Sequence, residues 1–479
     1  MSMMNKFRDI NPQTVFLIIG LIYGLGFLLA TPAFQVPDEY EHFYRSLYVS
    51  EGHVVPEKLG NLSGVYVPES VKVTSDTVNE KWYTFLQDRD NKTNLAPLLH
   101  LPFNSKNMVF EDISRIAVIT YSPVPYLVSA FAIDIGKLFN LAPLVLMYIG
   151  RLANLLAWIF LTYLAIKITP VHKWVFFMLA LLPMTLFEAA SLSADSFLLG
   201  ISFLIIAIFF KYAFDDNKKK INIKDIYILG ILLLLVGLAK SNYVLLLFLI
   251  FLIPARKFGN RKKMLLVTGS LFLVVFAVVG IWNLIVNGLY APIIPQVSIS
   301  GQILYILGDP FRFPYVLLNT FIKSGLSYQY LFVGNFWLDV PLPIWWLGFY
   351  LITIIPVALL DNNKINITRN QKLISAAIFI LNSITACALV YITWTPVGQN
   401  VIDGIQGRYF IPIFPLLFLL LYKIRNFENY YKKIDSNKLI IKNKSVIKII
   451  RENLNLILIS YIVIFLSITL LIFVLSYYI

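Results

Sequence analysis

The chain has 479 residues, of which 58% are hydrophobic and only 14% are charged, whereas soluble domains carry about 25% charged residues. This composition excludes a water-soluble globule, a disordered chain and a secreted or nuclear protein, and it places the whole chain in a membrane. The formal net charge is +14, but Lys and Arg are spread along the chain, which indicates membrane topology rather than binding to nucleic acid. The single cysteine, Cys387, lies within an apolar run, so disulfides, zinc clusters and thiol catalysis are not expected.

Long apolar runs recur along the whole sequence. A membrane-spanning helix needs about 20 mainly apolar residues, or fewer where it ends in a protein-lined cavity. By this criterion the sequence predicts an all-α, polytopic membrane protein, with eleven spans in a single domain that covers residues 1–479. The predicted spans are residues 14–33, 144–166, 174–191, 196–213, 226–239, 243–254, 264–286, 343–360, 373–393, 409–422 and 454–478. The first run is long and many more follow it, so we interpret it as an anchor rather than a cleaved signal peptide.

The basic residues predict the orientation of these spans. If the N-terminus is cytoplasmic, most Lys and Arg residues fall in segments on the inner side, including the basic loop at residues 423–453. The positive-inside rule therefore predicts a cell-membrane protein with a cytoplasmic N-terminus and an external C-terminus. The sequence shows neither an internal repeat nor the inverted hydropathy symmetry of many transporters.

Two long segments are predicted to lie outside the membrane. Residues 34–140 are too long for an ordinary connection, and loops of this size are usually functional. Within them, the apolar piece 121–139 is expected to form a helix in the outer interface, because a crossing there would conflict with the charge pattern. The second external segment, residues 286–343, is rich in aromatic residues and proline.

Ionisable groups at membrane depth are costly unless they line a cavity, so each one is a functional candidate. The sequence Pro-Asp-Glu-Tyr-Glu-His-Phe-Tyr-Arg directly follows the first predicted span. If Asp38 starts a helix on the membrane surface, helical spacing places Asp38, His42 and Arg45 on one face, with Glu39 beside them. An acid, an imidazole and a guanidinium together suit the activation of a hydroxyl near an anionic group. The alternative is that Asp38 only caps the helix and that these charges are solvated.

Further candidates lie around the middle of the chain. The span that ends near residue 191 delivers Glu188 and Asp195 to the outer side, although Asp195 also fits a helix cap. The apolar pieces on either side of Lys240 are each too short to cross a core of about 30 Å, so they predict a hairpin with Lys240 and Tyr243 at its tip. A lysine there can extend toward the surface, but a lipid phosphate or a similar anion explains a buried cation better.

The short polar segment after the ninth span adds an amide and a cation. Gly404 and Gly407 flank the pair Ile405–Gln406 and permit close approach of the backbone to a ligand. Arg408 then enters a span, where a guanidinium can bind a phosphate through two parallel hydrogen bonds. An interfacial arginine anchor is the alternative interpretation.

Two other residues carry less weight. Asp339 follows Trp337 in an aromatic external segment, and aromatic faces and carboxylates are common sugar contacts, but a tryptophan here also fits the interfacial aromatic belt. Arg151, at the start of the second predicted span, is expected only to mark the headgroup level.

Five separated segments, in order along nearly the whole chain, resemble the bacterial membrane family known as domain of unknown function 2142. They are residues 37–45, residues 182–195, Lys240 with Tyr243, residues 332–339 and residues 406–410. That family is similar to the GT-C superfamily of multi-pass glycosyltransferases, which use sugars carried on polyprenyl phosphates. The pair Asp38–Glu39 resembles their catalytic acidic signature, most closely that of protein O-mannosyltransferases, and a short external loop carrying Asp195 matches their arrangement.

The resemblance implies a transferase that moves a sugar from a polyprenyl-phosphate donor to a cell-envelope glycan or lipid acceptor on the outer face of the membrane. Asp38 is then the base that deprotonates the acceptor, and Glu39 is the second member of the catalytic pair. The cations neutralise the departing phosphate. The side chains expected to contact substrate are His42, Arg45, Glu188, Asp195, Lys240, Tyr243, Asp339, Gln406 and Arg408.

The chain departs from the superfamily in two ways. The spaced Asp-x-Asp of oligosaccharyltransferases is absent, so Mg²⁺ or Mn²⁺ is compatible with the carboxylates but not required by them. No soluble C-terminal domain follows, which leaves the acceptor undefined. A transporter or flippase of polyprenyl-linked glycans, a glycan polymerase or ligase, and a structural scaffold are the alternatives, although a scaffold gives no reason for Lys240.

Overall fold

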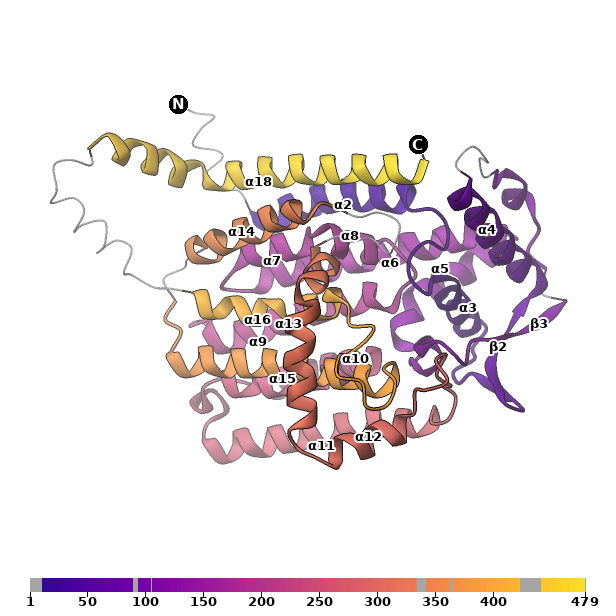
Figure 1. The fold of residues 1–479 in the computed structure, drawn as a ribbon. Coiled ribbons are helices and arrows are strands. Elements are labelled where there is room, and N and C mark those ends of the chain that lie inside the picture. The colour runs from indigo at the N-terminus through magenta and orange to yellow at the C-terminus, as the bar shows by residue number, and fades with distance from the viewer. Residues whose placement is uncertain are drawn as a thin grey trace.

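The computed structural model describes residues 11–88, 94–104, 106–333, 342–361, 365–422 and 441–478. Most of these residues are helical, and the long helices lie side by side in one bundle (Figure 1). A smaller part, built from helices and three strands, lies at one end of the bundle, at the right of Figure 1. We call this part, residues 34–138, the lobe. The expectation of an all-α membrane protein is confirmed, and the three short strands are a small addition to it.

Six helices of the described chain are long and apolar enough to cross a membrane. They are α2 (Pro12–Ala30), α6 (Pro143–Ile168), α9 (Ala194–Phe214), α11 (Arg261–Ile285), α15 (Arg369–Thr393) and α18 (Ile441–Tyr478), whose apolar stretch is Asn455–Tyr478. Each of these six helices coincides with one of the spans predicted from the sequence.

The other five predicted spans correspond to shorter or interrupted helices. They are α7 (Lys173–Ala180) with α8 (Pro183–Ala189), α10 (Ile223–Ala239), η5 (Ser241–Leu252), α14 (Ile344–Leu360), and the series η7 (Gly407–Ile413), α16 (Phe414–Phe418) and η8 (Leu419–Leu421). A short helix, η6 (Ala255–Phe258), links η5 to α11. The break between α7 and α8 precedes Pro183, because proline fits the first turn of a helix but not its interior. The count of eleven spans therefore stays a prediction.

Helix α9 lies at the centre of the bundle. In its most apolar window 89% of the residues are buried, and a helix that is hydrophobic on every side is typically surrounded by others. Helix α6 packs along α9, and α2 packs along α6. Gly24 permits this close packing, because a Cβ at that position would lie 2.7 Å from Leu155 Cδ1.

The first and last helices run in the same direction. The hydroxyl of Tyr23 donates to the carbonyl of Val463 at 2.9 Å, and further along both helices the rings of Phe27 and Phe473 are 5.5 Å apart. Both helices therefore end beside the lobe (Figure 1). The basic residues predict a cytoplasmic N-terminus and an external C-terminus, and this topology requires the first and last helices to run in the same direction.

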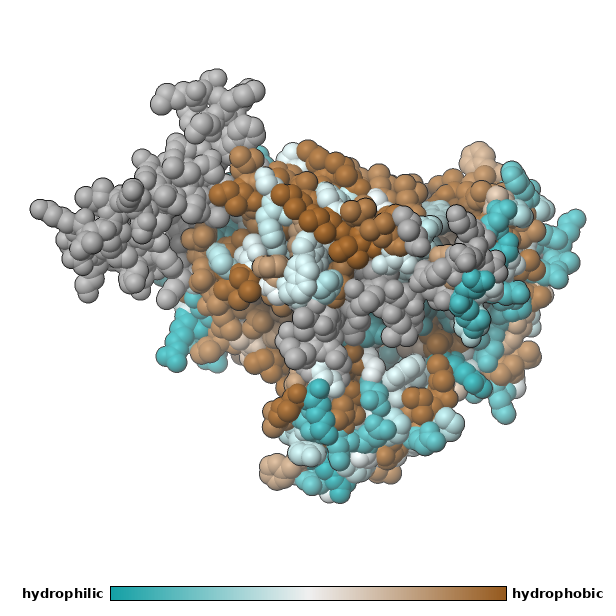
Figure 2. Space-filling view, turned by 45° about the horizontal axis from the view of Figure 1, so that its top comes forward, coloured by the Kyte–Doolittle hydropathy of each residue, from teal (hydrophilic) through white to brown (hydrophobic). Residues whose placement is uncertain are grey.

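The outside of the bundle is apolar. Helix α11 exposes large hydrophobic side chains, among them Leu266, Leu273 and Leu284, which are 63%, 71% and 76% exposed. Figure 2 shows apolar residues over much of the helical part, whereas hydrophilic residues gather on the lobe at the right. An apolar surface of this extent is suited to contact with lipid chains.

The lobe combines a small sheet with short helices. Its elements are α3 (Glu39–Ser50), β1 (Glu57–Leu59), β2 (Leu62–Pro68), α4 (Glu69–Gln87), η2 (Ala96–His100), β3 (Met108–Asp112), η3 (Ala117–Thr120), η4 (Val124–Tyr126) and α5 (Leu127–Leu138). The strands pair antiparallel in the order β1-β2-β3, with Gly64 opposite both Glu57 and Asp112. A Cβ at Gly64 would lie 1.9 Å from the carbonyl oxygen of Glu111, so only glycine fits between the strands there.

The predicted interfacial helix at residues 121–139 is only partly correct. The helix begins at Leu127, and the residues before it enter the protein, where Tyr126 is completely buried. Ser129 and Ile133 are also completely buried, because α5 packs against α6 and α3 instead of lying free on a surface.

The segment at residues 286–343 is helical over most of its described length. It contains α12 (Ile299–Leu307) and α13 (Arg312–Val333). In Figure 1, α13 runs across the direction of the long helices, at a large angle to them. Helix α13 holds the loop before η7, because Asn319 Nδ2 donates to the carbonyl of Asn400 at 2.7 Å and the backbone N–H of Ile402 donates to Thr320 Oγ1 at 2.9 Å. The candidate Asp339 lies outside the described residues.

The contact between α2 and α6 can be tested at Gly24. We expect Gly24→Leu to destabilise the protein by about 1–3 kcal/mol, since the added side chain must displace Leu155. The control is Gly269→Leu in α11, where a Cβ meets nothing within 4 Å. Thermal unfolding in detergent, followed by tryptophan fluorescence, measures both variants, and equal melting temperatures would contradict this packing.

Candidate functional site

The turn between α2 and α3 presents the side chain of Asp38. Phe34 and Asp38 both adopt left-handed backbone conformations, with φ of 60° and 57°, which are uncommon and costly for residues other than glycine. The Asp38 side chain makes no capping hydrogen bond to α3, so the alternative that it caps the helix is not what the structure shows. Its carboxylate is exposed.

Asp38 is exposed, and neighbouring protein groups change its ionisation. Surrounding protein atoms desolvate the carboxylate and raise the pKa of Asp38 above its ordinary value of 3.8, while the nearby cations Arg408 and Lys240 act in the opposite direction. Asp38 therefore lies within electrostatic reach of both cations, although residues 38, 240 and 408 come from three distant parts of the sequence.

The neighbouring acid, Glu39, is completely buried and bound to Arg151. Arg151 Nε donates to Glu39 Oε1 at 2.8 Å, and Arg151 Nη2 donates to Glu39 Oε2 at 2.5 Å. The same guanidinium also donates to the carbonyls of Thr31 and Pro32, at 2.8 and 2.9 Å. The expectation that Arg151 only marks the headgroup level is wrong, because its side chain is 0% exposed.

The pair also reaches the turn before α9. Glu39 Oε1 accepts a further hydrogen bond from the backbone N–H of Leu192, at 3.2 Å. Both oxygens of Glu39 are thus engaged in holding backbone segments together, whereas the carboxylate of Asp38 faces solvent. The two adjacent acids, which the sequence placed in one catalytic pair, occupy different environments.

Helix α3 is buried on nearly all sides, so His42 and Arg45 lie inside the protein while Asp38, at the start of the helix, is exposed. His42 Nδ1 shares a hydrogen bond of 2.8 Å with the hydroxyl of Tyr126, and burial lowers the pKa of His42 to about 3, so its imidazole is neutral at neutral pH. Arg45 donates to the carbonyls of Tyr121 and Val54 at 3.0 and 3.3 Å. Arg45 supports the lobe from inside, whereas His42 also lies within electrostatic reach of Asp195, Lys240 and Arg408.

The predicted hairpin brings Lys240 against an acid. Lys240 follows α10 and precedes η5, and its Nζ donates to Asp195 Oδ1. Its ammonium also lies 5.7 and 5.3 Å from the ring centres of Tyr121 and Tyr409, where cation–π attraction helps to fix it. Ser193 caps α9, by accepting a hydrogen bond from the backbone N–H of Asp195, so the carboxylate of Asp195 is left to bind Lys240.

A second ion pair completes the site. Arg408 Nη1 donates to Glu188 Oε1, and the two side chains are 10% and 1% exposed. Two buried atoms of this pair, Arg408 Nε and Glu188 Oε2, have no hydrogen-bond partner. Gln406, which precedes η7, is not among the residues that line the pocket described next.

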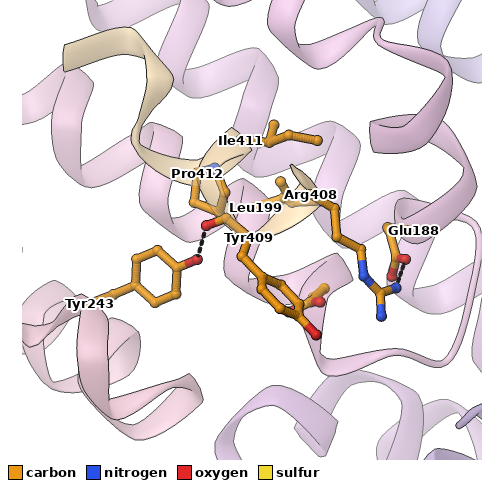
Figure 3. A pocket seen from close by; sticks show the side chains of 8 residues that line it. Glu188, Leu199, Tyr243, Arg408, Tyr409, Ile411 and Pro412 are labelled. Atoms are coloured by element: carbon orange, nitrogen blue, oxygen red, sulfur yellow. Dashed lines mark hydrogen bonds and ion pairs between the residues drawn. The ribbon is translucent and has the colours of Figure 1, made fainter. Parts of the chain in front are cut away.

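The two ion pairs border one small pocket. Figure 3 shows Arg408 beside Glu188 at one end and Tyr243 at the other, with the ring of Tyr409 between them. Tyr243 joins the two sides, because its hydroxyl donates to the carbonyl of Tyr409 at 2.5 Å. The pocket is small and is lined by Glu188, Asp195, Leu199, Tyr243, Arg408, Tyr409, Ile411 and Pro412.

Sequence reasoning missed several residues around this site. Tyr121 and Tyr409 cover Lys240. Tyr409 lies in the segment 406–410 that carries the family resemblance, whereas nothing in its apolar run distinguishes Tyr121 from other tyrosines. Glu41 is 2% exposed, with its Oε2 atom unpaired, and burial raises the pKa of Glu41 to about 8. Glu41 lies one helical turn after Asp38, and this spacing could have marked it in the sequence as a neighbour of Asp38.

The described residues contain no group of three His, Cys, Asp or Glu side chains that is arranged to hold a metal ion. The two acids that line the pocket, Glu188 and Asp195, are each bound to a cation. Asp38 is exposed and does not itself line the pocket, but it lies within electrostatic reach of the paired cations Lys240 and Arg408.

One comparison with known proteins gives a match. The model of a family described as "Predicted membrane protein (DUF2142)" matches residues 21–417. No curated protein and no solved structure matches the chain.

The Arg151–Glu39 pair gives a test of the turn that holds Asp38. Removing one partner of a buried ion pair leaves an uncompensated charge, so we expect Arg151→Gln to lower the stability by about 3–5 kcal/mol. The double variant Glu39→Gln/Arg151→Gln should lose less than the sum of the two single variants. Thermal unfolding in detergent measures all three.

The matched control for that series is Lys72→Gln, which breaks the partly exposed pair between Lys72 and Glu111, 2.8 Å apart. An exposed pair contributes at most about 1 kcal/mol. If the Arg151→Gln and Lys72→Gln variants have the same melting temperature, Arg151 does not hold the turn.

Glu41 gives a pH test. Its pKa of about 8 in the folded protein exceeds the ordinary 4.5, so folding favours the protonated acid and stability falls as the pH rises through this interval. We expect the melting temperature of the wild type to fall between pH 5 and pH 8 relative to that of Glu41→Gln. The exposed Glu80→Gln should follow the wild type. Parallel curves for the wild type and Glu41→Gln would show that Glu41 is ionised in the folded protein.

Proposed function

The chain belongs to the DUF2142 family of predicted membrane proteins, and we propose that it is a glycosyltransferase of the GT-C type. In this proposal it moves a sugar from a polyprenyl-phosphate donor to a cell-envelope glycan or lipid acceptor. The proposal includes the finer topology, with eleven spans, a cytoplasmic N-terminus and a site that faces outside.

One observation carries the proposal: the exposed Asp38 lies within electrostatic reach of two buried cations, Lys240 and Arg408. Transfer of a sugar to a hydroxyl needs a base near the acceptor and positive charge near the leaving phosphate. Asp38 meets the first need, because its side chain is exposed and lies near both cations. Lys240 and Arg408 meet the second, because both act on Asp38 and Arg408 lines the pocket.

The proposed reaction is a single inverting displacement. The Asp38 carboxylate takes the proton of the acceptor hydroxyl while the hydroxyl oxygen bonds to the anomeric carbon of the sugar. The bond from that carbon to the phosphate oxygen breaks, and the electron pair leaves with the polyprenyl phosphate. Lys240 and Arg408 stabilise the negative charge that grows on the leaving phosphate, which is worth most where water is excluded.

The strained turn supports a catalytic role for Asp38. A non-glycine residue in a left-handed conformation persists only where its surroundings enforce it, and such residues cluster at functional sites. Here Arg151 enforces the conformation, because it binds Glu39 and the carbonyls of Thr31 and Pro32 before Asp38. A scaffold protein gains nothing from this arrangement.

Asp38→Asn tests the proposal directly. We expect transfer of sugar in membranes supplied with a polyprenyl-phosphate sugar to fall by at least about 100-fold, because a general base contributes at least that factor. The control is Asp134→Asn, the same change on the exposed surface of α5, where Asp134 is 56% exposed. The assay is the mass of the glycosylated product.

The outcomes of this assay separate the alternatives. Full transfer by Asp38→Asn would rule out Asp38 as the base. A wild type that moves lipid-linked glycan across the membrane without any transfer is a transporter or flippase. A product that grows by a block of sugars, instead of by one sugar, identifies a polymerase or ligase.

A further inference from the structure

We propose that Tyr126 is a positioning residue, which holds the imidazole of His42 as a neutral hydrogen-bond donor whose Nε2–H binds an oxygen atom of the sugar phosphate. This inference rests on the proposed function and deepens it, because it gives His42 a defined role at the same site and names the residues that fix its proton. It is carried by the contacts of His42, Tyr126 and Arg45 at the junction of the lobe and the bundle.

The segment between η3 and α5 lies at this junction. Ser122 Oγ donates to the carbonyl of Leu238 at 2.7 Å, near the end of α10 and two residues before Lys240. The ring of Tyr121 lies 5.7 Å from the ammonium of Lys240 and 6.2 Å from the ring of His42. The segment therefore connects the lobe to the part of the bundle that holds the cations.

His42 lies between Tyr126 and the charges of the site. Its Nδ1 shares a hydrogen bond of 2.8 Å with the hydroxyl of Tyr126, and both side chains are buried. Asp195, Lys240 and Arg408 lie within electrostatic reach of the imidazole. In the part of the chain that the structure describes, the imidazole makes no other hydrogen bond, so Nε2 is the ring nitrogen that is left for a ligand.

Arg45 determines the direction of the hydrogen bond. It is completely buried, its Nε and Nη1 atoms have no partner, and no carboxylate among the described residues forms an ion pair with it. Its guanidinium lies 5.9 Å from the ring centre of Tyr126 and within electrostatic reach of the hydroxyl. A cation attracts the oxygen of a hydroxyl and repels its hydrogen, so Tyr126 points its hydrogen away from Arg45 and donates it to His42 Nδ1.

This hydrogen bond fixes the tautomer of His42. A neutral imidazole has one donor and one acceptor nitrogen, and the hydrogen bond at one nitrogen sets the state of the other. When Nδ1 accepts from Tyr126, the ring proton is on Nε2. Burial lowers the pKa of His42 to about 3, so the ring gains no second proton at neutral pH. Its free nitrogen can therefore donate to the substrate but cannot take a proton from it, and Asp38 stays the base.

A neutral donor suits the charges already present. Lys240 and Arg408 are each bound to an acid, and a buried charge is costly unless it is paired. A neutral N–H binds an oxygen of the sugar phosphate without adding a charge to the site. The same arrangement gives a reason for the buried charge of Arg45, which forms no ion pair among the described residues.

The tautomer can be measured in the full-length protein in proteoliposomes. Solid-state NMR after selective nitrogen-15 labelling reports the four histidines of the chain, and the signals lost in His42→Gln belong to His42. We expect a protonated Nε2 and an unprotonated Nδ1 in the wild type, and a second set of His42 signals in Tyr126→Phe. The control is Tyr350→Phe, which removes the hydroxyl of another completely buried tyrosine, bound to the carbonyl of Met178, and should leave the His42 signals unchanged.

Sugar transfer tests the role of the Nε2–H. The amide nitrogen of glutamine lies near the position of Nε2, whereas that of asparagine lies near the position of Nδ1. We therefore expect kcat/KM of His42→Gln to exceed that of His42→Asn by about three- to tenfold, the contribution of one hydrogen bond. Tyr126→Phe should lose a similar factor, because His42 is no longer held in one state, and Tyr350→Phe should transfer sugar like the wild type.

Three results would overturn the inference. They are a proton on Nδ1 of His42 in the wild type, unchanged His42 signals and unchanged transfer in Tyr126→Phe, and equal transfer by folded His42→Gln and His42→Asn. All three leave the proposed glycosyltransferase function intact, since Asp38→Asn tests that function. Absence of transfer by the wild type, with the expected tautomer present, would instead contradict the proposed function and leave the arrangement of His42 and Tyr126 in place.

Discussion

The guanidinium of Arg151 joins three parts of the chain at one point. It binds both oxygens of Glu39 and the carbonyls of Thr31 and Pro32, and Glu39 in turn binds the backbone of Leu192. The first helix, the start of the lobe and the turn before α9 are thereby fixed relative to one another. Because Asp38 precedes Glu39 and the Leu192 turn leads to Asp195, this contact sets the geometry of the whole site.

The site itself is built from opposite charges that the bundle encloses. A buried ion pair is a weak source of stability, because desolvation of both charges offsets their attraction. The Lys240–Asp195 and Arg408–Glu188 pairs are therefore better explained by what they offer a ligand than by what they add to folding. Both cations are held in place, one of them between two tyrosine rings, so little reorganisation is needed when charge develops beside them.

The sequence predicted the helical membrane class and several candidate residues, because both follow from local patterns. Apolar runs gave the six long helices, and the short runs around residue 240 gave the hairpin with Lys240 at its tip. The pairing of the charges was not predictable, since Glu188 and Arg408 are 220 residues apart. Arg151 was misjudged because an arginine near the end of a span usually marks the interface. The strands were missed because β1 has only three residues and β3 only five.

The central claim is that Asp38, Lys240 and Arg408 surround one ligand. The most direct measurement is an experimental structure of the protein in a bilayer mimic with a bound prenyl phosphate. The account predicts phosphate density within hydrogen-bond distance of Lys240 and Arg408, with the carboxylate of Asp38 facing the same space. Density for the lipid phosphate elsewhere, with the pocket empty and both ion pairs undisturbed, would contradict it.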